Sequence, residues 1–178
     1  VFFFTRKNDS NQHITAEAAS DSTTIESEIN NNWTGVDPNT PVANYEEIRD
    51  SDLQVHASKD YAVYSLQDVV LFGTGEYAIG KTGSMKLAKI VASANKRFKN
   101  GSFIIYGYTD TVGKIEENKT LALNRVNAVK AWLVEFEKIS PDRVKVNPIG
   151  EAGSDFSNST EQGRQKNRRI DIVVKNSE

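Results

Sequence analysis

The feature that most restricts the fold is a short apolar run, residues 103–108, that lies between two stretches with helical periodicity. A run of this length is typical of a strand buried on both faces, because a buried helix needs more residues. Before it, residues 84–98 repeat apolar positions at helical spacing, and Gly101 ends that helix. After it, residues 116–138 predict a longer helix, which Pro141 prevents from continuing. A buried strand between two helices indicates an α/β protein.

The remaining segments extend this pattern into a sheet. Five of them have the apolar content of strands: residues 52–58, 61–66, 69–72, 144–149 and 169–174. Residues 160–166 predict a short helix, and the helix over 116–138 is expected to turn five apolar residues inward: Leu121, Val126, Val129, Leu133 and Phe136. The resulting order, β-α-β-α-β-(α)-β, predicts an α/β (α+β) sandwich in which helices pack on a mixed sheet.

Charge is divided unevenly along the chain. Residues 1–50 contain nine acidic and three basic residues, although the whole chain has a net charge of only −2. Apolar residues after Phe4 are few and aperiodic in this part, so burial cannot offset chain entropy. We therefore expect residues 1–44 to be a flexible polar and acidic linker or tail, and residues 45–178 to form the folded domain. A flexible coil of about 40 residues spans roughly 30–40 Å.

Composition excludes several classes of function. The chain has no cysteine and only two histidines, so we predict no disulfide, no thiol nucleophile, no metal site and no cofactor. No apolar run reaches the roughly 18–20 residues that cross a bilayer. The net charge of −2 argues against nucleic acid as a partner, and the basic residues within 164–169 are interpreted as a solvated face.

Two charged residues stand out as candidates for a site. Asp110 follows the buried strand, at the end of the sheet where α/β proteins usually place ligands. Arg125 lies on the side of the following helix that borders the core, where a guanidinium is costly unless it is paired. The residues alone favour a salt bridge between Asp110 and Arg125. The alternative is a split pair that binds the ammonium and the carboxylate of a zwitterion.

At these residues the chain resembles the OmpA C-terminal domain family, the peptidoglycan-binding module shared with Pal lipoproteins and flagellar MotB stators. The similarity covers residues 66–178 and leaves residues 1–44 out. Four blocks carry it: Val70, Leu71 and Phe72 with a turn and Ile79; residues 106–110 (YGYTD) with Gly113; Asn118, Leu121 and Arg125 in the spacing NxxLxxxR; and residues 158–170 (NSTEQGRQKNRRI).

The resemblance implies a mixed sheet with packed helices and non-catalytic binding of peptidoglycan through the meso-diaminopimelate of its stem peptide. By the matched motifs, Asp110 would take the ammonium and Arg125 the carboxylate of the free diaminopimelate end. The other residues implied for this site are Thr109, Thr111, Asn118, Leu121, Arg168, Phe72, Gly73, Thr74 and Gly75. Backbone amides of the two loops would complete the pocket, and Asn118 and Arg168 would line it.

The chain also departs from the family pattern. Tyr108 replaces the common histidine, at a position expected to flank the site. Gly73, Thr74 and Gly75 replace the usual Asp or Asn and aromatic residues of the first loop, which removes polar side chains that could face the ligand. The affinity for the stem peptide is therefore expected to depend on the remaining residues.

The same resemblance implies an envelope protein. We expect a periplasmic domain tethered to the outer membrane of a Gram-negative bacterium, with the inner membrane as second choice. The membrane would be reached only through a segment before Val1, and homodimerisation is left open.

Two alternatives compete with wall anchoring. One is a stator-like or partner-binding envelope module in which the Asp110–Arg125 pair is structural. The other is a peptidoglycan hydrolase or amidase, which needs a metal triad or a carboxylate pair that the spacing does not support. We therefore predict that the chain is not an enzyme.

Overall fold

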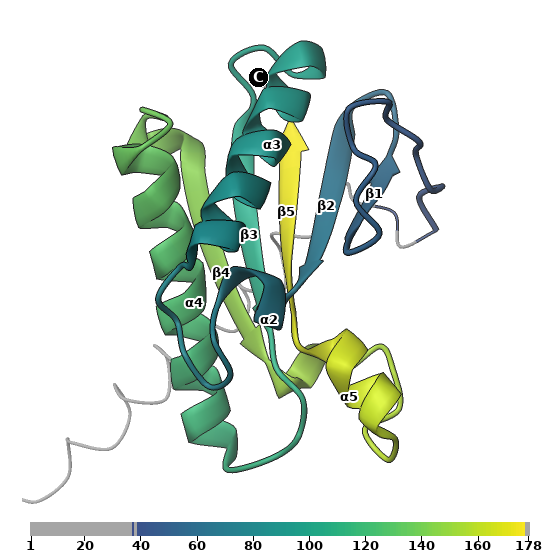
Figure 1. Cartoon of the computed structure of the whole chain (residues 1–178), viewed down its shortest axis with the longest axis vertical. Helices are drawn as coiled ribbons and strands as arrows, with labels where there is room; N and C mark the ends of the chain where they lie inside the picture. The colour runs from purple at the N-terminus through teal and green to yellow at the C-terminus, as the bar shows by residue number, and fades with distance from the viewer. Residues whose placement is uncertain (1–36, 38, 177–178) are drawn as a thin grey trace, which may run out of the picture. The chain divides into compact units, whose positions relative to one another are not determined.

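The chain folds around a five-stranded mixed sheet with the strand order β1-β2-β5-β3-β4 (Figure 1). The structure is a computed structural model that describes residues 37 and 39–176. Strands β3 and β4 run parallel, and the other neighbouring strands run antiparallel. The strands are β1 (Leu53–Ala57), β2 (Tyr61–Gln67), β3 (Ser102–Tyr108), β4 (Val144–Gly150) and β5 (Arg169–Lys175). The predicted mixed sheet with helices is confirmed.

The two long helices, α3 (Lys81–Arg97) and α4 (Ile115–Glu135), cover one face of the sheet (Figure 1). The shorter helices are α2 (Asp68–Leu71) and α5 (Glu161–Asn167), and 3-10 turns occupy Pro141–Arg143 and Glu151–Gly153. Helix α3 begins at Lys81, three residues earlier than expected, and its N-cap residue Gly80 provides no side-chain cap. Within the described residues, no helix has the length and apolar content needed to cross a membrane.

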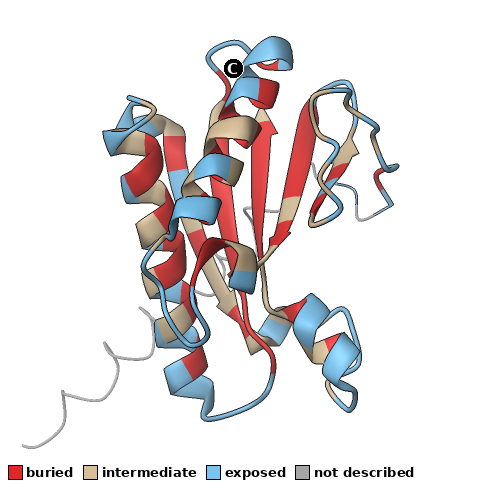
Figure 2. Ribbon diagram, viewed as in Figure 1, coloured by how far each residue is buried: buried red, intermediate tan, exposed pale blue. Residues whose placement is uncertain are grey.

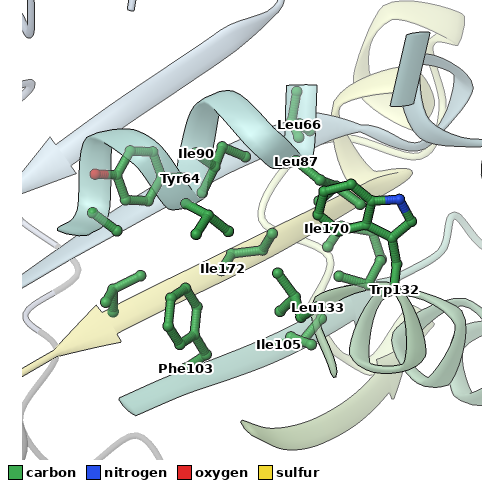
Figure 3. Close-up of a cluster of buried hydrophobic side chains, with 14 of the residues drawn as sticks. Tyr64, Leu66, Leu87, Ile90, Phe103, Ile105, Trp132, Leu133, Ile170 and Ile172 are labelled. Atoms are coloured by element: carbon green, nitrogen blue, oxygen red, sulfur yellow. The ribbon is translucent and has the colours of Figure 1, made fainter. Parts of the chain in front are cut away.

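The core lies between the sheet and these two helices. Strand β3 is buried from Phe103 to Tyr108, as predicted for the central apolar run (Figure 2). Alternate residues of β3 and β5 point toward the helices, where Phe103, Ile105 and Ile172 meet Leu133 of α4 (Figure 3). Helices thus cover one face of the central strand and neighbouring strands flank both of its edges. Ile104 and Tyr106, which alternate with the residues that face the helices, are buried as well.

Residues 69–72 are not a strand, and this prediction is wrong. After Gln67 the chain turns into α2, whose residue Asp68 donates its backbone N–H to the carbonyl oxygen of Arg168 at 3.0 Å. Helical geometry buries Asp68 and Leu71 on one side and leaves Val69 54% exposed. A short apolar run has no period that separates strand from helix, so packing decided the outcome.

Phe136 does not point into the core, which corrects a second expectation. Helix α4 ends at Glu135, and the Phe136 side chain is 67% exposed. Its ring stacks on that of Trp132, with 5.7 Å between the ring centroids. Trp132 is the buried member of this pair.

Within the described residues, the segment before β1 belongs to the same compact unit as the sheet, which begins at Asp37. Val42 pairs with His56 of β1, and the Thr40 side chain contacts the hydroxyl of Tyr61. Residues 1–36 and 38 lie outside the described residues. The linker over residues 1–44 and its boundary with the domain therefore stay predictions.

Acidic residues of the segment before β1 fasten it to α3. Asp50 pairs with Lys86 and Lys89, each at 2.7 Å, and Glu47 pairs with Arg97. Hydrogen bonds from Arg97 and Ser93 lower the pKa of Glu47 to about 2, and those from Lys86 and Lys89 lower the pKa of Asp50 to about 2.

These two carboxylates predict an acid-sensitive contribution to stability. A pKa that is lower in the folded state stabilises the fold above the unfolded value, and this stabilisation is lost as pH falls through the folded value. The window runs from the ordinary values of 4.5 for Glu47 and 3.8 for Asp50 down to about 2. Thermal melts between pH 2 and pH 6 are expected to show less acid dependence in Glu47→Gln than in wild type. Glu46→Gln, an exposed neighbour, is the matched control. Equal acid dependence in all three proteins would contradict this prediction.

Candidate functional site

The candidate site lies at the end of the sheet where β2 and β3 both finish. These strands run in the same direction because each is antiparallel to β5 between them. Helix α2 therefore follows β2, and the loop with Asp110 follows β3, at the same edge where α5 leads into β5 (Figure 1). The sheet topology thus brings together side chains far apart in sequence.

Arg125 of α4 is buried in an ion pair with Asp68 of α2. Its Nη1 lies 2.7 Å from Oδ2 of Asp68, and the two side chains are 3% and 9% exposed. Its Nε donates to the carbonyl oxygen of Glu76 at 3.0 Å, and the guanidinium lies 5.3 Å from the ring centroid of Phe72. One interpretation of the sequence paired Arg125 with Asp110. The structure instead pairs Arg125 with Asp68.

Asp110 is held by two other groups. Its Oδ2 accepts from Nη1 of Arg168 at 2.5 Å, and its Oδ1 accepts from the backbone N–H of Val112 at 3.0 Å. Arg168 also donates to Oε1 of Glu161 at 2.9 Å. Asp110 and Arg168 are thus brought together as the resemblance implied, although Arg168 contacts the carboxylate of Asp110 directly.

Burial and ion pairing shift the pKa values of these charged groups in opposite directions. Burial raises the pKa of Asp68, and the guanidinium of Arg125 opposes this rise. Burial lowers the pKa of Arg125. The carboxylate of Asp68 and, more weakly, that of Asp110 oppose this lowering. Burial alone would lower the pKa of Arg168, but hydrogen bonds to Glu161 and Asp110 raise it overall. The two arginines and two aspartates therefore form one coupled group of charges.

Asn118 fixes the loop that carries Asp110. Its Nδ2 donates to the backbone oxygens of Asp110 and Val112, at 3.2 and 3.1 Å, and to Oε2 of Glu151 at 2.8 Å. The Thr109 backbone N–H donates to the carbonyl oxygen of Gly150 at 3.0 Å. Asn118 thus binds the backbone of the loop, whereas the resemblance implied that its side chain lines the pocket.

The two threonines of this loop differ in exposure. Thr111 is exposed, and its backbone N–H lies 3.4 Å from Oδ1 of Asn158. Thr109 is buried, and within the described residues its Oγ1 has no hydrogen-bond partner.

The first loop, Gly73, Thr74 and Gly75, is exposed at the rim of the site. Gly75 has a φ of 71°, a left-handed conformation that favours glycine. An open groove of about 370 Å³ runs from Gly75 and Tyr77 to Leu121, Glu116 and Glu117 at the start of α4. Gly75 and Leu121 are therefore brought to one surface, whereas the Phe72 side chain is buried.

Asp68 is the site residue that the sequence analysis missed. It directly precedes the run 69–72, which was assigned to a strand, and an acidic residue in the first turn of a helix was the available signal.

Among residues 37 and 39–176, no three His, Cys, Asp or Glu side chains are placed to hold a metal ion.

Comparison with known proteins then decides the family. The OmpA family model matches residues 71–168, more than half of the chain. The chain belongs to the OmpA family. The match spans the loop with Asp110, the helix with Arg125 and the arginine at position 168.

The chain is also similar to individual curated proteins. It is 26% identical over 129 residues to a probable lipoprotein, YiaD, of Escherichia coli, covering 72% of this chain and 58% of the relative. It is 31% identical over 106 residues to the peptidoglycan-binding protein ArfA of Mycobacterium tuberculosis, covering 56% of this chain and 32% of the relative. The chain thus spans less than two thirds of these curated relatives.

A solved structure extends the likeness to three dimensions. The cell wall anchor of the type VI secretion system from Pseudomonas aeruginosa superimposes with a TM-score of 0.65. The match covers 74% of this chain and 93% of the anchor at 19% identity. At this level of identity the comparison establishes the fold.

Proposed function

We propose that this chain binds peptidoglycan without catalysis, through the diaminopimelate of the stem peptide, and anchors a bacterial envelope protein to the cell wall. The observation that carries the proposal is the coupled group of two carboxylates and two guanidiniums, of which Asp110, Arg125 and Arg168 lie within the residues that the family model matches. Such a group offers an acceptor for an ammonium at Asp110 and a donor for a second polar group at Arg125. A mycobacterial relative named as peptidoglycan-binding supports the binding of peptidoglycan.

The proposed location is the periplasm, with a tether to the outer membrane. It is supported by the E. coli relative, which is named a probable lipoprotein. A single charge-assisted site gives modest affinity. Many copies on one membrane that face one polymer would add avidity.

Co-sedimentation with purified diaminopimelate-type peptidoglycan tests this function. Asp110→Asn keeps the size of the side chain but removes the charge that an ammonium needs. We expect it to weaken binding by about tenfold or more. Arg125→Lys keeps the charge opposite Asp68 and removes the planar fork, so it is expected to weaken binding as well.

The matched control is Asp60→Asn, the same change in the exposed turn between β1 and β2. It is expected to pellet like wild type. Thermal melts establish that each variant is folded. A wild-type protein that stays in solution, or a folded Asp110→Asn variant that pellets like wild type, would argue against the proposal.

A stator-like or partner-binding module is the second candidate. It is favoured by the observation that Arg125 and Asp110 each already have an internal partner, Asp68 and Arg168. In that case wild type would not pellet with peptidoglycan, and Asp110→Asn would lower only the melting temperature. The same experiment therefore separates the two candidates.

A further inference from the structure

The guanidinium of Arg125 already has a carboxylate partner inside the chain. Asp68 lies 2.7 Å from its Nη1, and neither side chain is more than 9% exposed. A ligand carboxylate that approached Arg125 would bring a second negative charge toward Asp68 across the same guanidinium. Like charges placed together in this way oppose binding.

The charge of the whole group points in the same direction. Asp68, Asp110 and Glu161 are balanced by three guanidiniums, those of Arg125, Arg168 and Arg164, so the connected charges sum to zero. Glu116 and Glu117 line the adjoining groove, and Lys114 pairs with Glu117. A site without surplus positive charge, beside an acidic groove, offers less attraction to a ligand carboxylate than to a neutral carboxamide.

The second partner of Arg125 is an amide. Its Nε donates to the backbone carbonyl oxygen of Glu76 at 3.0 Å, beside the bond to Asp68. An amide oxygen from a ligand could replace this carbonyl with the same hydrogen-bonding character. A primary carboxamide also carries an NH₂ group, which can donate to a carboxylate such as Asp68. The Arg125–Asp68 pair therefore presents a donor and an acceptor that complement a carboxamide.

We propose that Asp68 determines the specificity of this site, so that it prefers a diaminopimelate end whose carboxyl group is amidated to one with a free carboxylate. The ammonium of that end pairs with Asp110, and its carboxamide meets Arg125 and Asp68. This inference rests on the proposed function, because it concerns the second half of the same ligand end.

Isothermal titration with two soluble muropeptides tests this proposal. The two differ only in the free-end carboxyl of diaminopimelate, which is a carboxylate in one and a carboxamide in the other. For wild type we expect the carboxamide to bind more tightly. For Asp68→Asn, which removes the internal negative charge, we expect the ratio of the two dissociation constants to shift by about tenfold toward the carboxylate. Asp60→Asn, with the same loss of charge in a distant exposed turn, is expected to keep the wild-type ratio.

Each outcome bears on a different statement. Tighter wild-type binding of the carboxylate would overturn the specificity without any variant, even if Asp68→Asn does not fold. An unchanged ratio in folded Asp68→Asn would overturn the role of Asp68, while binding of both muropeptides would leave the proposed function intact. If wild type binds neither muropeptide, the proposed function fails and this inference fails with it.

Discussion

Replacing Asp68 with leucine is expected to lower the free energy of unfolding by about 3–5 kcal/mol. The change leaves the guanidinium of Arg125, whose side chain is 3% exposed, without its ionic partner. A buried charge without a partner retains its desolvation cost and loses the attraction that offset it. Urea denaturation followed by circular dichroism measures the loss. Asp60→Leu, the same substitution in an exposed turn, is expected to change stability by less than about 0.5 kcal/mol.

The double variant Asp68→Leu/Arg125→Met separates the structural from the functional role of the pair. Replacing both charges with apolar groups removes the unpaired charge, so most of the lost stability is expected to return. We expect the double variant not to bind peptidoglycan, because the hydrogen-bond donor at position 125 is gone. A double variant no more stable than Asp68→Leu would contradict the assignment of the ion pair as the cause.

Substituting Gly163 with alanine is expected to destabilise the fold by about 3 kcal/mol, at the upper end of the cost of overpacking. A Cβ atom at Gly163 would lie 1.8 Å from the carbonyl oxygen of Ser157, so the backbone must move. The helix that shifts is α5, whose C-cap residue Arg168 holds Asp110. Binding to peptidoglycan is therefore expected to weaken together with stability.

Gly80→Ala is the matched control for this substitution. The nearest atom to a Cβ there is the carbonyl oxygen of Leu71, at 3.9 Å, which is ordinary contact. Its cost should stay within about 1 kcal/mol, since only the N-cap preference of α3 is affected. Thermal melts of both variants make the comparison, and equal melting temperatures would rule out the close approach at Gly163 as a constraint.

Local patterns in the sequence predicted most of the elements. The apolar run of β3 and the helical periods of α3 and α4 each extend over enough residues to define one conformation. The run 69–72 is too short for this. The structure places it in a helical turn because Leu71 packs against Gly83, where an added Cβ would lie 2.6 Å from the Leu71 carbonyl oxygen. Close backbone packing between residues distant in sequence cannot be read from the local sequence pattern.

The sequence by itself determined the mixed sheet with its covering helices, and it singled out Asp110, Arg125 and Arg168 as candidate site residues. Only the tertiary structure decided which charge pairs with which. Asp68 and Arg125 are 57 positions apart and meet at 2.7 Å because β5 lies between β2 and β3 and aligns their ends. Ion pairing depends on distance in space and on burial, and strand order sets both of these at this edge of the sheet.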